Sequence, residues 1–177
     1  ELANKWISES GTISLLIHSA QTDSNADVRH TAVKELARYW ETNSGRLSTV
    51  ELKNIILDDR SGDVCLAAIQ TISRKCQGNP ETLSILKNCV DTNSRNGSAR
   101  ILALQELVRG WKGSQEILNI LKKTAQDDSE WDVRLTSLQA LARGWKADPE
   151  TLPILKNAVR SDENWDVRST ALQEIVH

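Results

Sequence analysis

Few side chains in the sequence are arranged for catalysis. Serines are numerous, but none stands in the G-x-S-x-G pattern of a nucleophile elbow, and no G-x-x-x-x-G-K-[ST] phosphate-binding loop occurs. Paired carboxylates such as Asp127 and Asp128 are expected to cap turns. The histidines lie far apart and lack a second ligand at metal spacing; they are His18, His30 and His177. We therefore predict that the protein is not an enzyme and has no metal and no cofactor.

The cysteines are a second chemical signal. Cys65 and Cys76 are separated by about three helical turns and could share a helix face, and Cys89 follows on the next helix. No C-x-x-C pair is present, and an odd number of cysteines favours thiols in a reducing compartment. We expect small, buried side chains rather than a redox or metal site.

Regularly spaced glutamines and arginines are the side chains best suited to binding. The planar guanidinium can hold a carboxylate or a phosphate through two parallel hydrogen bonds. Acidic residues such as Glu35, Glu106 and Glu174 stand between the columns and disfavour a surface for phosphate alone. We predict a recognition surface, the Gln/Arg strip, and the alternative is an ordinary solvated helix face. The strip consists of Lys34, Arg38, Gln70, Arg74, Gln105, Arg109, Gln139, Arg143 and Gln173.

The strip follows an internal repeat. The tetrapeptide WDVR stands at 131–134 and returns at 165–168. Steps of 34 to 36 residues are typical of stacked helix pairs. Aligning the arginine of the motif gives one column, which holds Arg29, Cys65, Arg100, Arg134 and Arg168.

Both halves of each repeat have helical periodicity. In the first WDVR block the apolar residues recur at helical spacing, and nothing in the sequence alternates with period two. The second half places Leu152, Leu155 and Val159 on one face, and Asp148 and Pro149 are expected to cap and open it. One such pair cannot close a core, so neighbouring pairs are expected to stack into a solenoid.

We expect one domain, 1–177, built from these repeats. LANKW at the N-terminus matches LARYW and LARGW further along, so the chain is expected to begin and end inside repeats. The second half of the first full repeat, RLSTVELKNIIL, is less regular than the others. The predicted repeats are 1–25 (partial), 26–61, 62–96, 97–130, 131–164 and 165–177 (partial).

An acidic column precedes the WDVR aspartates by four residues; it holds Asp23, Asp59, Asp128 and Asp162. We predict that these carboxylates pair with arginines of neighbouring repeats, as a ladder through the turns. Asp132 is expected to accept backbone N–H groups, and Trp145 to pack on Trp165. The alternative is that WDVR binds a ligand directly. The residues assigned to this structural ladder are Asp27, Arg29, Arg100, Asp132, Arg134, Asp166, Arg168, Trp111, Trp131, Trp145 and Trp165.

Composition narrows the class of protein. The 177 residues include 22 Lys and Arg against 24 Asp and Glu, which is less basic than a nucleic-acid-binding domain usually is. No apolar run approaches the roughly 20 residues that span a bilayer. The N-terminal segment lacks the basic and apolar parts of a secretory signal. We expect a cytoplasmic protein that does not bind membranes, in an oligomeric state left open.

The residue pattern of the repeats resembles that of a known family. The pattern DxxWDVRxxxLQxLARGWKxDPETLPILKxxV resembles HEAT repeats, and ARGWKxDPETLPxLK is similar to the HEAT-like arrays of bacterial NACHT-type (STAND) signalling ATPases. The resemblance is clearest in 114–177, while Cys65 and Cys76 replace the arginine and tryptophan of the pattern. It implies an all-α fold, a right-handed α-α superhelix of about five repeats of about 34 residues each. It also implies that the VR helices line the concave surface.

The resemblance implies a non-catalytic, protein-binding scaffold, the sensor or ligand-recognition end of a larger signalling protein. Two alternatives remain. HEAT-like solenoids similar to alkylpurine DNA glycosylases grip DNA, although the net charge of −2 disfavours nucleic acid here. Phycobilin lyases also resemble HEAT repeats, but they need a chromophore site that the sequence does not indicate.

Overall fold

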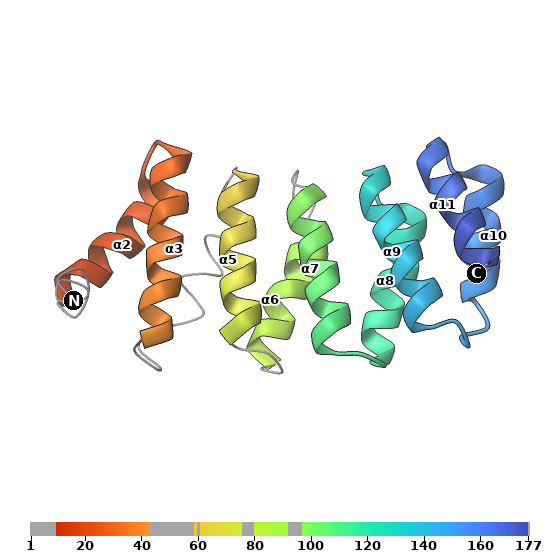
Figure 1. The fold of residues 1–177 in the computed structure, drawn as a ribbon, viewed down its shortest axis with the longest axis horizontal. Helices are drawn as coiled ribbons and strands as arrows, with labels where there is room; N and C mark the ends of the chain where they lie inside the picture. The colour runs from red at the N-terminus through yellow and green to blue at the C-terminus, as the bar shows by residue number, and fades with distance from the viewer. Residues whose placement is uncertain (1–9, 43–58, 60, 76–79, 92–96, 177) are drawn as a thin grey trace. The chain divides into compact units, whose positions relative to one another are not determined.

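The computed structural model describes residues 10–42, 59, 61–75, 80–91 and 97–176. These residues form nine α-helices and no strand (Figure 1). The all-α solenoid class predicted from the periodicity is therefore confirmed. Some expectations fall outside the described residues: the helix over RLSTVELKNIIL, the LANKW segment, Cys76 and His177.

The chain divides into two compact units, which cover residues 1–85 and 86–177. In the first unit α3 packs against α2 on one side and α5 on the other. The largest side chains buried there are apolar or aromatic, and include Leu36, Tyr39 and Ile69. The helices are α2 (Ser10–Thr22), α3 (Ala26–Thr42), α5 (Gly62–Lys75) and α6 (Pro80–Asp91), the last of which crosses the boundary.

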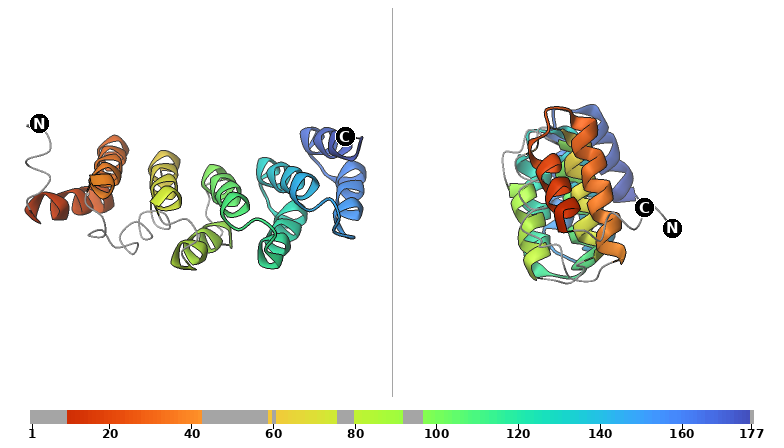
Figure 2. Two further views of the ribbon diagram at one scale, coloured as in Figure 1. Left: turned by 60° about the horizontal axis from the view of Figure 1, so that its bottom comes forward. Right: turned by 90° about the vertical axis from the view of Figure 1, so that its left-hand side faces the viewer.

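The second unit is a double layer of helices. The odd-numbered helices α7, α9 and α11 lie side by side, and α8 and α10 form the other layer (Figure 2). Each layer covers the apolar stripes of the other, as stacked helix pairs require. The helices are α7 (Gly97–Gly110), α8 (Gln115–Asp127), α9 (Trp131–Gly144), α10 (Thr151–Ser161) and α11 (Trp165–Val176).

The junction of α8 and α9 shows how the core tolerates polar atoms. Leu138 and Leu141 are fully buried on α9, on the stripe that the helical spacing predicts. The neighbouring Ser137 is also buried, and its hydroxyl is 2.7 Å from that of Thr124 on α8. Ser137 also donates to the Val133 carbonyl at 3.0 Å. Both buried hydroxyls are satisfied, so they add a specific contact at little desolvation cost.

The start of α10 differs from the prediction. The helix begins at Thr151 with Glu150 as its N-cap residue, so Asp148 and Pro149 precede the helix. The Asp148 carboxylate instead accepts the Glu150 amide at 3.0 Å and closes the turn. The Thr151 hydroxyl donates to the Trp145 carbonyl at 2.8 Å and holds the helix start against the end of α9.

The buried face of α10 also differs from the predicted stripe. Thr151, Ile154, Leu155 and Ala158 are buried, whereas Leu152 is 45% exposed. The predicted stripe was wrong at Leu152, because the hydroxyl of a threonine, rather than a leucine, faces the core at the first turn.

At the start of each of α3, α9 and α11 a side chain accepts a backbone amide. Asp132 is the second residue of α9, and its carboxylate accepts a backbone amide as predicted, that of Val133 at 2.9 Å. In α3 and α11 the side chains of Asn25 and Asn164 cap instead, accepting the amides of Asp27 and Asp166, each at 2.8 Å. The aspartate of DVR is thus a first-turn residue that faces the positive end of the helix dipole.

Two leucines of the second unit differ in burial, so we expect their replacement to lower the free energy of unfolding by different amounts. Replacing the fully buried Leu138 with alanine should lower the free energy of unfolding by about 2–5 kcal/mol, because a cavity is left in the core. The same change at Leu152, which is 45% exposed, should cost less than about 1 kcal/mol. Urea unfolding followed by circular dichroism measures both losses. Equal losses would contradict the unequal burial of the two leucines.

Candidate functional site

Arg134 shows how one repeat is joined to the next. Its Nε and Nη2 donate to the two carboxylate oxygens of Asp162, each at 2.8 Å. Its Nη1 donates to the backbone carbonyl of Asp128 at 2.8 Å. The side chains of Arg134 and Asp162 are only 7% and 8% exposed. One guanidinium therefore holds its own turn through a carbonyl and the following turn through a carboxylate, in the bidentate geometry that favours arginine over lysine.

The following turn is itself organised by the same carboxylate. An oxygen of Asp162 accepts the Asn164 amide at 2.9 Å. Burial raises the pKa of the Asp162 carboxyl, but the hydrogen bonds from Arg134 and Asn164 and the charge of Arg168 outweigh it, so the net pKa lies below its ordinary value. The hydrogen bond from Asp162 likewise raises the pKa of Arg134 against its desolvation. The pair is charged throughout the physiological range.

The same arrangement recurs at two other joints, as the two aligned columns predict. Arg100 donates to both carboxylate oxygens of Asp128 at 3.1 and 2.9 Å. Arg29 donates to both oxygens of Asp59 at 2.6 and 3.0 Å. Arg29 also donates to the Asp23 carbonyl at 2.8 Å. We call these three bidentate pairs the Arg–Asp ladder.

Cys65 occupies an arginine position of the ladder. Its thiol donates to the Asp59 carbonyl at 3.3 Å, the contact that Nη1 makes in Arg29 and Arg134. Burial, together with the charge of Asp59, raises the pKa of the Cys65 thiol to about 11. The thiol therefore stays protonated and keeps the carbonyl contact, and a single S–H lacks the additional donors with which a guanidinium also binds a carboxylate. Cys65 and Cys89 are both buried and outside any disulfide.

The tryptophans of WDVR lie at the surface. Trp131 is 41% exposed and Trp165 is 65% exposed, each as the first residue of its helix. Trp111 and Trp145 are half-buried at the ends of α7 and α9. The packing of Trp145 on Trp165 stays a prediction, and the exposure of Trp165 means that most of its ring faces solvent.

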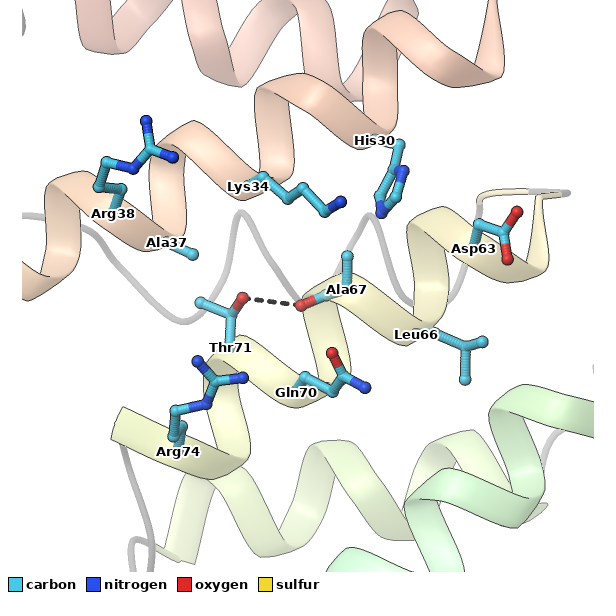
Figure 3. A pocket seen from close by; sticks show the side chains of 10 residues that line it. All are labelled: His30, Lys34, Ala37, Arg38, Asp63, Leu66, Ala67, Gln70, Thr71 and Arg74. Carbon is cyan, nitrogen blue, oxygen red and sulfur yellow. Dashed lines mark hydrogen bonds between the residues drawn. The ribbon is translucent and has the colours of Figure 1, made fainter. Parts of the chain in front are cut away.

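The Gln/Arg strip meets a hollow in the first unit. Four strip residues line it, Lys34 and Arg38 from α3 and Gln70 and Arg74 from α5. The hollow has a volume of about 490 Å³. Figure 3 shows Lys34 extending from α3 and Gln70 and Arg74 from α5. We call this site the α3–α5 hollow.

Charge in the α3–α5 hollow is predominantly positive. Arg38 forms an ion pair with Glu35 at 3.0 Å on its own helix. Within the described ranges, neither Lys34 nor Arg74 forms an ion pair. Among the described lining residues, Asp63 carries the one carboxylate. The Thr71 hydroxyl donates to the Ala67 carbonyl at 2.7 Å, so its hydrogen is already used within α5.

The strip of the second unit is charge-balanced. Arg109 is paired with Glu106 on α7. Arg143 on α9 donates to Glu174 on α11, at 2.7 and 3.1 Å from its two nitrogens. The glutamates that interleave with the strip in sequence therefore contact its arginines directly. The remaining strip residues here are Gln105 and Gln173, which are exposed, and Gln139, which is half-buried.

Two titratable lining residues, His30 and Asp63, were not among the predicted site residues. His30 stands four residues before Lys34, so helical spacing alone places both on one face of α3. Asp63 belongs to the first turn of α5, and its place beside His30 depends on how α3 and α5 pack. In the described part of the chain, no group of three or more His, Cys, Asp or Glu side chains is placed to hold a metal ion.

Repeated helix pairs, covered stripes and turn-to-turn arginine bonds define an all-α solenoid. A family profile described as HEAT repeats matches residues 49–142 and 91–175. The chain belongs to the HEAT repeat family. No curated protein and no solved structure matches the chain. Among the described helices, none combines the length and the apolar character needed to cross a membrane.

The ladder predicts that replacing two arginines lowers the free energy of unfolding by very different amounts. Replacing Arg134 with alanine should cost about 3–5 kcal/mol, because it leaves the Asp162 carboxylate buried without its partner. Replacing Arg143, whose side chain is 67% exposed, should cost at most about 1 kcal/mol. Thermal and urea unfolding measure both, and similar losses would show that the ladder contributes no more than a surface ion pair.

The ladder also predicts a pH dependence. Folding lowers the Asp162 pKa from its ordinary value of 3.8, so its contribution is complete above that value and is lost as the pH falls through the lower folded-state pKa. The free energy of unfolding should therefore decrease on acidification below about pH 4. Asp162→Asn removes the titrating group, and its decrease should be shallower. Identical slopes for both proteins would contradict the assignment.

Proposed function

We propose that the chain is a non-catalytic scaffold that binds a protein partner along the Gln/Arg strip. The observation that carries the proposal is the α3–α5 hollow, where four strip residues from two helices line one site. Membership in the HEAT repeat family supports a scaffold or interaction role. The ladder supports it as well, because it connects repeats through their turns and leaves the strip side chains accessible.

We further propose that the chain forms the sensor or ligand-recognition end of a bacterial, cytoplasmic signalling ATPase of the NACHT (STAND) type. The support is the similarity of ARGWKxDPETLPxLK to the arrays of those proteins. The ATPase chemistry would belong to another segment of the parent, since the P-loop pattern is absent from these 177 residues. A reading frame that encodes this chain without an ATPase segment would contradict this parentage.

Site-specific photo-crosslinking tests the proposed surface. A photoreactive amino acid at Gln70 or Gln105, both exposed strip residues, should capture the same protein from cells of the source organism. The same amino acid at Lys156, exposed on α10, is the matched control and should capture none or much less of it. Each adduct is identified by mass spectrometry. Capture from Lys156 as efficient as from the strip would refute the strip as the partner surface.

A further inference from the structure

The cations of the α3–α5 hollow differ from those of the second unit. Arg109 and Arg143 are each held by a glutamate of the protein. In the hollow, Lys34 and Arg74 are exposed, and neither forms an ion pair with a described residue. Only this part of the described strip therefore presents lysine and arginine side chains whose charge is not already balanced by a carboxylate.

The cations lie on both walls of the hollow. Lys34 projects from α3 toward His30, and Arg74 projects from α5 on the opposite wall (Figure 3). Asp63 lies at the His30 end, far along α5 from Arg74. An anionic chain lying between the two helices would meet positive charge from both sides.

The polar groups between the cations suit a peptide. Gln70 lies between Asp63 and Arg74 along α5, and its amide can both donate to and accept from a peptide group. The floor includes the small side chains of Ala37 and Ala67, which leave room for an extended backbone. The volume of about 490 Å³ is within the range of sites that hold several residues or a small ligand.

Carboxylates of the protein lie beside the cations of the hollow. Asp63 lines the hollow, and Glu35 lies beside Arg38 in the ion pair. These two carboxylates offset part of the positive charge, so the lining suits a ligand whose single charges are separated in space and can meet the cations one at a time. Alternating acidic side chains of an extended segment can reach Lys34 and Arg74 while avoiding Asp63.

We propose that the α3–α5 hollow binds an extended, carboxylate-rich segment of a partner protein, with Lys34 and Arg74 holding carboxylates from opposite walls and Gln70 holding a peptide group. This inference rests on the proposed function, because it names the chemistry of that partner. The proposal assigns anion recognition to the strip residues of the first unit. The charge-balanced strip of the second unit takes no part in anion recognition.

Fluorescence anisotropy with a labelled (Glu-Ser)₄ peptide and the full 177-residue chain tests the proposal. The peptide should bind, and (Gln-Ser)₄ should not. Combining Lys34→Glu with Arg74→Glu should weaken binding at least about tenfold, because two attractive charges become repulsive. Raising NaCl from about 50 to about 300 mM should also weaken it, since the contacts are solvent-exposed and screened.

The matched control is Lys156→Glu with Arg160→Glu. Both residues are exposed on α10, outside the strip, and the double change alters the net charge by the same amount. Its affinity should stay within about twofold of the wild type, as expected for charges distant from the contact. An equal loss in this control would reduce the binding to non-specific attraction and overturn the proposal.

Further measurements cover an unfolded variant, binding of RNA in place of the peptide, and failure of the peptide to bind. Circular dichroism checks helicity, and if the charge-reversal variant unfolds, Lys34→Gln with Arg74→Gln replaces it and should still weaken binding. Binding of single-stranded RNA with the same dependence on Lys34 and Arg74, without peptide binding, would overturn the peptide assignment. If photo-crosslinking from Gln105 succeeds while (Glu-Ser)₄ fails to bind, the scaffold function stands and the acidic partner segment is refuted.

Discussion

The bidentate bond from an arginine of one turn to an aspartate of the next is the constraint on which the repeat array depends. Removing both charges from water is costly, and the cost is offset only when the donors of the guanidinium and the oxygens of the carboxylate are used. Arg134 meets this condition, because three of its nitrogens bind Asp162 and the Asp128 carbonyl and Asp162 also accepts a backbone amide. The hydrogen bonds of Arg134 thereby hold the two consecutive turns at a fixed spacing.

Because the buried joints are made by the turns and the first turns of helices, the exposed helix faces are not needed for the ladder. The two units use these faces differently. In the second unit, glutamates neutralise the strip arginines, and the Arg143–Glu174 contact connects α9 with α11. In the first unit, the strip opens into a hollow with Lys34 and Arg74 on opposite walls. One repeat pattern thus supports a surface whose charge changes along the chain.

The environment of Lys122 could not be predicted from the amphipathic pattern of its own helix. It belongs to the helix opposite the strip, where an amphipathic pattern would leave it in solvent, yet its side chain is only 13% exposed. Its ammonium contacts Asp148 at 2.9 Å and Glu150 at 3.1 Å, in the turn before α10. The Asp148 hydrogen bond raises the pKa of Lys122, and Lys122 in turn lowers that of Asp148. This bridge depends on the packing of α8 and α10, which no single-helix periodicity contains.

The sequence by itself determined the helices, their pairing into repeats, and the aligned arginine and aspartate positions that pair in the ladder. These follow from the sequence because the spacing of residues gives both the helical period and the repeat length. It also placed Lys34, Arg38, Gln70 and Arg74 in register. Tertiary structure decided where α10 begins, which asparagines cap, and that Cys65 keeps the carbonyl contact of an arginine. It also decided which strip arginines meet a glutamate and which line a hollow, because such contacts depend on distances between helices that are remote in the chain.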